Sequence, residues 1–215
     1  MVQFIQNKNP DSNEILDVLR NIPRSPGTCI YIDIADSTKM KYEHDIGIWG
    51  KKLNNTFNFI SFLNDFPENI IKGIGDEIML YIPDDVLRKK QNYNNHYALL
   101  EEIYATIFNI KSFPEHRLFA NCKVAVHFCM EAYNISFLEG FNDYYGRDID
   151  LTARLMSITR ENRIVISNAY YYKMSQDLEQ LDIKLENTCL KYISKKQSQK
   201  FKGIPFEIPV YYIDV

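Results

Sequence analysis

Apolar residues recur along the chain at two spacings, and the changes of spacing predict its helices and strands. Helical spacing, or a short polar-capped run, predicts helices at 11–20, 43–64, 94–112, 147–160 and 168–175. Apolar runs bounded by turn residues predict strands at 29–34, 69–72, 77–82, 122–130, 163–167, 185–193 and 208–213. The order βαββαβ predicts a ferredoxin-like α+β domain, with an antiparallel-rich sheet and helices on one face.

Two carboxylates fall at the ends of predicted strands. Asp33 follows an apolar run, where a carboxylate is costly unless it is paired or binds a metal. Asp76 lies at the tip of a hairpin, after the turn segment Gly73-Ile74-Gly75. The first strand lies beside this hairpin in the predicted topology, so the two carboxylates can converge. Hard oxygen ligands of this kind suit two Mg²⁺ or Mn²⁺ ions, which would activate a hydroxyl and clamp a triphosphate.

The turn after the first strand, Ala35-Asp36-Ser37-Thr38, is a candidate phosphate site. Backbone N–H groups at the start of a helix bind anions, and we expect Ser37 and Thr38 to contact phosphate. The alternative is purely structural: Asp36 or Ser37 caps a helix, and Asp76 is an ordinary turn residue.

Composition and charge narrow the function classes. A chain of 215 residues with 46% hydrophobic residues suits one domain with a proper core. We expect an N-terminal helix and lead-in over 1–27 and a catalytic domain over 28–215. The net charge of −3 argues against a nucleic-acid partner. The four cysteines are far apart, without a C-x-x-C pair, which favours reduced thiols.

Membrane and export segments are not expected. The longest apolar runs, such as Ile78–Ile82, are far shorter than the ~20 residues of a membrane span. The N-terminal segment lacks a charged region followed by an apolar one, so we expect no signal peptide and a cytoplasmic location. The lysine-rich stretch 191–202 is expected to be a solvated hairpin rather than a phosphate-binding surface.

Four blocks resemble the motifs of class III adenylate and guanylate cyclases, in the family order and across residues 30 to 213. The blocks are YIDIADST at 31–38, KGIGDEIM at 72–79, DYYGRDIDLTARL at 143–155 and FKG at 201–203. The resemblance implies the class III cyclase fold and a reaction that makes a 3′,5′-cyclic nucleotide and pyrophosphate from a nucleoside triphosphate.

The same resemblance implies roles for single residues. Asp33 and Asp76 would hold two metal ions, Mn²⁺ or Mg²⁺, with help from the Ile34 carbonyl. Arg154 would stabilise charge on the α-phosphate, and Lys202 would contact the terminal phosphates. The alternative for Arg154 is a helix-surface salt bridge, and for Lys202 a plain surface position.

Three further positions of the resemblance concern the ribose and the base. Asp150 lies four residues before Arg154, where most family members place the asparagine that orients the ribose. Lys72 and Asp143 align with the two residues that read the base edge. In the family the metal aspartates come from one subunit, and Lys72, Asp143, Asp150 and Arg154 from the other. The resemblance therefore implies a homodimer with two composite sites.

The choice of base rests on the Lys72 and Asp143 pair. A lysine and a carboxylate fit the edges of adenine, cytosine and uracil, but they fit guanine less well. The block with Asp150 in place of asparagine is similar to the bacterial pyrimidine cyclases of Pycsar antiphage systems. We therefore expect a pyrimidine cyclase, with UTP preferred over CTP, whose product a separately encoded effector would read.

Two alternatives remain open. The first is an adenylate cyclase that makes cyclic AMP. The second is an inactive nucleotide-binding or dimerisation module, against which the retention of Asp33, Asp76 and Arg154 argues. For base selection, the Tyr144-Tyr145 pair beside Asp143 is expected to supply a ring that narrows the base slot, with Tyr145 the more core-like of the two.

Overall fold

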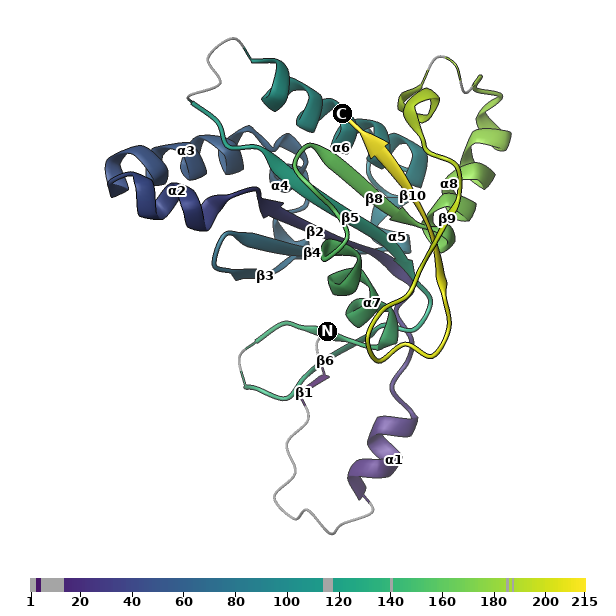
Figure 1. The fold of residues 1–215 in the computed structure, drawn as a ribbon. Coiled ribbons are helices and arrows are strands. Elements are labelled where there is room, and N and C mark those ends of the chain that lie inside the picture. Colours follow the sequence, from purple (N-terminus) through teal and green to yellow (C-terminus); the bar gives the residue numbers. More distant parts are fainter. Residues whose placement is uncertain (1–2, 5–13, 114–117, 140, 185, 187) are drawn as a thin grey trace.

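A seven-stranded sheet forms the centre of the protein (Figure 1). The computed structural model describes residues 3–4, 14–113, 118–139, 141–184, 186 and 188–215. The strands lie in the order β3-β4-β2-β5-β8-β10-β9. Their bounds are β2 (Gly27–Ile34), β3 (Ile70–Ile74), β4 (Glu77–Pro83), β5 (Cys122–Cys129), β8 (Arg163–Ser167), β9 (Gln197–Gln199) and β10 (Ile208–Asp214). Only β5 and β8 run parallel within this sheet, so the prediction of an antiparallel-rich sheet is confirmed.

A second, small sheet and a helix come from the N-terminal part and the segment after β5. Strands β1 (Gln3–Phe4), β6 (Tyr133–Ser136) and β7 (Tyr144–Tyr145) pair in the order β1-β6-β7. Helix α1 (Glu14–Arg20) lies apart from the main sheet (Figure 1). A small apolar cluster of Leu19, Ile22, Tyr133 and Ile135 connects this region to β6.

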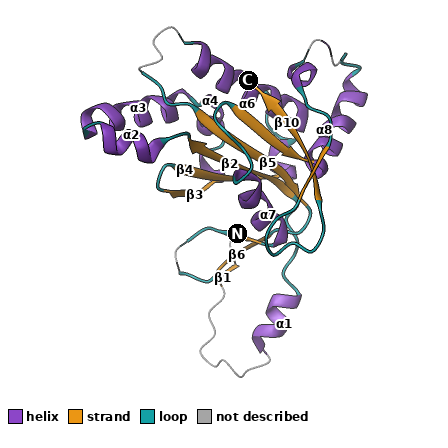
Figure 2. Ribbon diagram, viewed as in Figure 1, coloured by secondary structure: helices purple, strands orange, loops and turns teal. Residues whose placement is uncertain are grey.

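Helices cover both faces of the main sheet, but unequally (Figure 2). The larger layer packs on one face and contains α3 (Ile46–Phe59), α4 (Ser61–Asp65), α6 (His96–Ser112) and α8 (Asn168–Leu181). Helix α7 (Arg147–Met156) packs on the opposite face. The prediction of helices on one face therefore describes the main helical layer, and α7 departs from it.

The alternation of β2 explains this arrangement. Ile30, Ile32 and Ile34 point into the larger helical layer, while Cys29 and Tyr31 point to the face under α7. Successive strand residues point to opposite faces, so a strand that is apolar at nearly every position must be covered on both.

Three predicted elements differ in the structure. The helix expected over 43–64 is divided among α2 (Ser37–Glu43), α3 and α4, because Asp45 begins a new helix by accepting a hydrogen bond from the Gly47 N–H. Helix α8 extends beyond 175, and α7 ends before 160. The described part of 185–193 contains a 3₁₀ helix, η3 (Cys189–Tyr192), rather than a strand. Residues 11–13 of the first predicted helix lie outside the described residues.

A buried ionic cluster joins α5 (Asp84–Leu87), α6 and α8 beneath the larger helical layer. The carboxylate of Asp177 accepts hydrogen bonds from Arg88 Nη1 at 2.9 Å and from the His96 backbone N–H at 2.7 Å. The Nδ1 atom of His96 lies 3.0 Å from the same carboxylate. Burial works to raise the pKa of Asp177, but the bonds from His96 and Arg88 outweigh it and lower the pKa to about 2.

This cluster makes stability depend on acid pH. A carboxyl with a lowered pKa in the folded state stabilises the protein fully above its unfolded pKa, about 4. That contribution, about 2 kcal/mol, is lost as the pH falls towards about 2. We expect Asp177→Asn to lower the free energy of unfolding at neutral pH, and the difference from wild type to shrink between pH 4 and pH 2. Denaturant unfolding across this range measures it, with Glu179→Gln, an exposed carboxylate on the same helix, as the control. An Asp177→Asn deficit that persists unchanged at pH 2 would contradict the ionic account.

All four cysteines are free and buried. Cys29 and Cys129 lie under α7, while Cys122 and Cys189 belong to the core beneath the larger helical layer. The prediction of unpaired thiols is confirmed. Among the described helices, none is both long and apolar enough to cross a membrane.

Candidate active site

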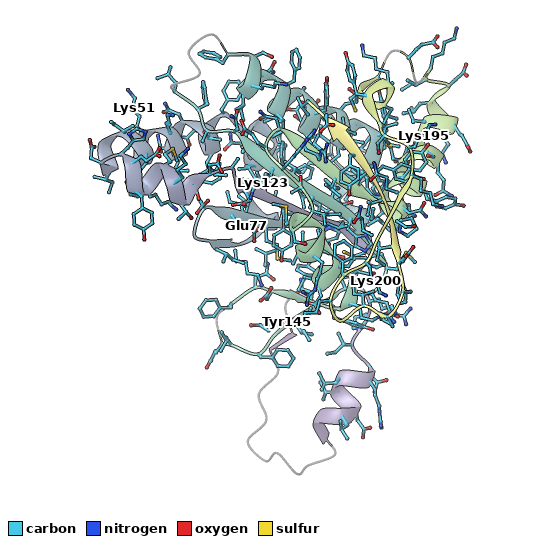
Figure 3. The ribbon with its side chains drawn as sticks, viewed as in Figure 1. Lys51, Glu77, Lys123, Tyr145, Lys195 and Lys200 are labelled. Atoms are coloured by element: carbon cyan, nitrogen blue, oxygen red, sulfur yellow. The ribbon has the colours of Figure 1, made fainter. Side chains whose placement is uncertain are left out.

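Three charged residues lie side by side at one end of the sheet face on which α7 packs. The strand register places Asp33 of β2 between Glu77 of β4 and Lys123 of β5. Figure 3 shows Glu77 and Lys123 at this end of the sheet. Burial and the nearby Asp33 carboxylate raise the pKa of Glu77. This end of the sheet therefore concentrates negative charge in a partly buried place.

Asp33 and Asp76 line one cleft, which we call the Asp33 cleft. Its volume is about 590 Å³, and it is lined by Asp33, Ile34, Asp36, Ser37, Thr38, Lys39, Tyr42, Asp76 and Lys123. The register explains the convergence, because Asp76 directly precedes Glu77, the partner of Asp33 across the ladder. The hairpin turn requires Gly75, whose φ of 68° is in the left-handed region.

Each of these two carboxylates forms an ion pair with a lysine side chain. Lys123 Nζ lies 2.5 Å from Asp33 Oδ2, and Lys41 Nζ lies 2.8 Å from Asp76 Oδ1. Burial works to raise the pKa of Asp76, but hydrogen bonds from Lys41 and Ser37 outweigh it and hold that pKa below its usual value. These bonds thus stabilise Asp76 in its charged form, and both carboxylates face the cleft.

The start of α2 borders the same cleft. Asp36 is the N-cap residue, with a φ of 54° and without a side-chain capping bond, so the alternative in which its side chain caps the helix is not supported. Ser37 is buried and bonded to Asp76, whereas Thr38 is exposed. Of the two expected phosphate contacts, only Thr38 has its side chain directed to solvent.

Lys72 and Asp143 form an ion pair between β3 and the segment before β7. Lys72 Nζ lies 3.0 Å from one carboxylate oxygen of Asp143 and 3.1 Å from the other. The backbone N–H of Tyr144 donates a hydrogen bond to the same carboxylate at 2.8 Å. The structure therefore brings together the two residues expected to read a base edge.

A second cleft, the Arg154 cleft, contains Asp150, Arg154 and Lys202. Its volume is about 440 Å³, and its other lining residues are Arg147, Asp148, Leu151, Gly203, Ile204, Pro205, Phe206 and Ile208. Arg154 is exposed, and within the part of the chain that the structure describes no ion pair joins it to Asp150. The alternative of a helix-surface salt bridge between these two residues is thus not observed.

The two clefts have no lining residue in common. Asp33, Ile34, Ser37, Thr38 and Asp76 line one of them. Asp150, Arg154 and Lys202 line the other. A single protomer therefore divides these eight residues between two clefts, and the Lys72–Asp143 pair lines neither of them.

Tyr31 is buried on the sheet face that α7 covers. It lies on β2 two residues before Asp33, and its hydroxyl donates to the sulfur of Met79 at 3.3 Å. Burial raises the pKa of Tyr31, and nearby acidic groups, Glu77 among them, raise it further.

The expectation for the tyrosine pair was wrong in one respect. Tyr144 is the core residue, because it is buried and stacks on Tyr81 with ring centroids 4.0 Å apart. Tyr145 is 39% exposed and packs edge-to-face on Phe137. The two side chains of a strand point to opposite sides, and the buried side here is that of Tyr144.

Comparison with solved structures identifies the fold. The protein is similar to the adenylyl cyclase CyaB from P. aeruginosa, with a TM-score of 0.66, 18% identity, and coverage of 90% of this chain and 95% of that one. It is similar to the guanylyl cyclase Cya2, with a TM-score of 0.65, 15% identity, and coverage of 89% and 93%. The chain has the fold of the nucleotide cyclase catalytic domain. No family model and no curated protein matches the sequence.

A third cyclase of this fold is the dimeric guanylyl cyclase domain of the RhoGC fusion protein from the aquatic fungus Blastocladiella emersonii. Its TM-score is 0.59 at 13% identity, and the match covers 88% of this chain and 96% of that one. The cyclase fold thus accounts for nearly all of the chain.

The Asp33 cleft of this cyclase fold suits divalent metal ions. Two carboxylates, each in an ion pair with a lysine, face a cavity large enough for phosphate groups. Among the described residues, no cluster of three or more His, Cys, Asp or Glu side chains could hold a metal by itself. Mg²⁺ is commonly held by one or two carboxylates, with substrate phosphates and water as the other ligands, so the donor set fits.

Sequence reasoning missed Lys41 and Lys123, the cations that neutralise the two aspartates. The signal for Lys123 was a lone charge at the start of an apolar strand, in Cys122-Lys123-Val124. Its partner follows only from the register of β2 against β5, which sequence periodicity does not supply. Lys41 is one of several lysines near Ser37 in the sequence, and nothing in the pattern distinguishes it.

Proposed function

We propose that this protein is a nucleotide cyclase, which converts a nucleoside triphosphate into its 3′,5′-cyclic monophosphate and pyrophosphate. The observation that carries the proposal is the convergence of Asp33 and Asp76 on one cleft within a cyclase fold. In the reaction the ribose 3′-oxygen bonds to the α-phosphorus, and the bond from that phosphorus to the pyrophosphate oxygen breaks.

The residues have distinct roles in this proposal. Asp33, Asp76 and the Ile34 carbonyl would hold two Mn²⁺ or Mg²⁺ ions, which would activate the 3′-hydroxyl and neutralise phosphate charge. Thr38 would contact phosphate at the start of α2, whereas the buried Ser37 side chain is bonded to Asp76. Arg154 would stabilise the charge that develops on the α-phosphate, and its guanidinium is exposed and has no ion pair with any described residue.

In this proposal the Arg154 cleft binds the ribose and the leaving group. Asp150 would accept a hydrogen bond from a ribose hydroxyl, and Lys202 would bind the terminal phosphates. Both line the same cavity as Arg154. This cavity has no residue in common with the Asp33 cleft, so one protomer does not assemble the whole set. We therefore propose a homodimer in which the Asp33 cleft of one protomer faces the Arg154 cleft of its partner.

Within this proposal the substrate is a pyrimidine nucleoside triphosphate, which the similarity of the block at 143–155 to pyrimidine cyclases implies. Lys72 and Asp143 present a donor and an acceptor to the base edge, which suits uracil, cytosine and adenine. We favour UTP, then CTP. A cytoplasmic role as an antiphage signal, read by a separate effector, goes with this choice. Adenylate cyclase activity is the second candidate, because the Lys72–Asp143 pair also fits adenine.

A competition assay tests the choice of base. With equal UTP, CTP, ATP and GTP and with Mn²⁺, we expect pyrimidine products to exceed cyclic AMP by about tenfold to a hundredfold, because a purine in a slot that fits a pyrimidine is a misfit costing ~1–3 kcal/mol. Lys72→Ala should lower this ratio, whereas Lys51→Ala, on exposed α3, should leave it unchanged. If cyclic AMP is the main product of the wild type, the pyrimidine cyclase proposal is wrong and the adenylate cyclase proposal replaces it.

A further inference from the structure

The first turn of α7 is attached to the end of β5 by close backbone packing. Gly146 precedes the helix with a φ of 149°, and a Cβ atom there would lie 2.0 Å from the Glu131 carbonyl oxygen. Only glycine allows so close an approach of two backbone segments. Arg147, the next residue, forms an ion pair with the Glu131 side chain. The start of α7 therefore packs closely against residues 130–131, and we call this contact the α7 seat.

Asp148 provides the strongest contact in this seat. A single carboxylate oxygen, Oδ2, accepts hydrogen bonds from the backbone N–H groups of Met130 at 2.7 Å and Glu131 at 2.8 Å. The other oxygen lies 3.5 Å from Nε2 of His127, which is buried in β5. The Thr152 hydroxyl, one turn along α7, donates to the Asp148 carbonyl at 2.8 Å.

His127 extends this chain of contacts across the sheet. Its Nδ1 atom lies 2.7 Å from the hydroxyl of Ser167. That hydroxyl also accepts a hydrogen bond from the Tyr170 N–H and so caps α8. Ser167 is buried, which excludes a nucleophilic role for this serine, histidine and aspartate series. The series is therefore a support that joins α7, β5 and α8.

The position of this support matters for catalysis because of what α7 carries. Asp150 and Arg154 lie two and six residues after Asp148 on the same helix, and both line the Arg154 cleft. We propose that Asp148 is a positioning residue, which fixes the helix that presents Asp150 and Arg154 to the substrate. This inference rests on the proposed cyclase activity. Small displacements of a catalytic group cost about a hundredfold in rate when they reach 1 Å.

Two substitutions distinguish a positioning role of Asp148 from an effect of its negative charge. Asp148→Ala removes the acceptor for both N–H groups, and we expect kcat to fall by about tenfold to a hundredfold. KM should change much less, because Asp33, Asp76 and Lys72 are not on α7. Asp148→Asn keeps one carbonyl oxygen, which can accept both bonds as Oδ2 does, so it should recover most of the lost kcat. Steady-state kinetics with the preferred triphosphate measures both variants.

Asp177→Ala is the matched control for a merely structural effect. Asp177 is a buried carboxylate that, like the half-buried Asp148, has a histidine and a backbone N–H as partners, but it lies under the opposite face of the sheet. It should lower thermal stability at least as much as Asp148→Ala and leave kcat unchanged below the unfolding transition. The proposal is overturned if Asp148→Ala keeps wild-type kcat, or if kcat falls equally in Asp177→Ala.

Amide hydrogen exchange keeps this test separate from the proposed reaction. In Asp148→Ala, exchange at Met130, Glu131 and the first turn of α7 should accelerate relative to α6, and Asp148→Asn should restore it. Wild-type protein that makes no cyclic nucleotide from any of the four triphosphates would refute the cyclase proposal, while exchange would still report the seat. Unchanged exchange in Asp148→Ala would overturn the positioning role by itself.

Discussion

Asp33→Ala and Asp76→Ala are each expected to abolish cyclase turnover, with a loss of at least about a hundredfold because metal ions contribute several kcal/mol to charge stabilisation. Both carboxylates line the same cleft, and each forms an ion pair with a lysine. Removing either one leaves a single acidic ligand facing the substrate phosphates. Product formation from the preferred triphosphate, with Mn²⁺ and with Mg²⁺, measures the effect.

The control for this experiment is Asp214→Ala. Asp214 is also a carboxylate at the end of a strand, paired with Arg163 at 2.6 Å, but it lies outside both clefts. It should retain most activity once folding is verified by circular dichroism. Retention of more than a few per cent of activity by Asp33→Ala or Asp76→Ala would show that the two-metal assignment is wrong.

Mixing two inactive variants is expected to restore activity. Asp76→Ala damages the Asp33 cleft and Arg154→Ala damages the other, so a mixed dimer has one interface with both clefts intact. Random exchange gives mixed dimers in about half of the population with one working site of two, or about a quarter of wild-type activity. The measurement is product formation after co-incubation or co-expression, with mixed dimers quantified by two affinity tags.

The negative control uses two variants of the same cleft. Asp33→Ala mixed with Asp76→Ala leaves every interface without an intact metal site, and no activity should return. If Asp76→Ala and Arg154→Ala form mixed dimers and still give no product, then sites built across an interface are refuted. If Asp76→Ala or Arg154→Ala were active alone, this would also contradict the proposal that each site needs both clefts.

The sequence predicts the sheet well because the strands that position the site are buried on both faces. β2, β4, β5 and β8 appear as continuous apolar runs, and their ends are marked by Asp33, Gly75 and Asn162-Arg163. The nearness of Asp33 to Asp76 could also be predicted, since it needs only a hairpin paired with the first strand. Local pattern and topology agree at these positions.

The remaining differences arise from side-chain hydrogen bonds and long-range packing, which the spacing of apolar residues does not encode. The apolar spacing of 43–64 suits one helix, yet Asp45 caps a new one, a choice that side-chain hydrogen bonding makes locally. The side of the sheet that α7 covers, and the burial of Tyr144 rather than Tyr145, depend on packing against Tyr81. The partners of the two aspartates depend on strand register, which no periodicity in one strand reveals.

Because its four thiols are buried, the protein is well suited to site-specific chemical labelling. Cys29, Cys122 and Cys129 have no exposed surface, and Cys189 is 3% exposed. A maleimide should therefore react with native protein only through transient opening, so the alkylation rate of the wild type counts unfolding events. A single cysteine introduced on the surface would then carry a fluorophore alone, and pairs of labelled protomers would report association without any change to the native residues.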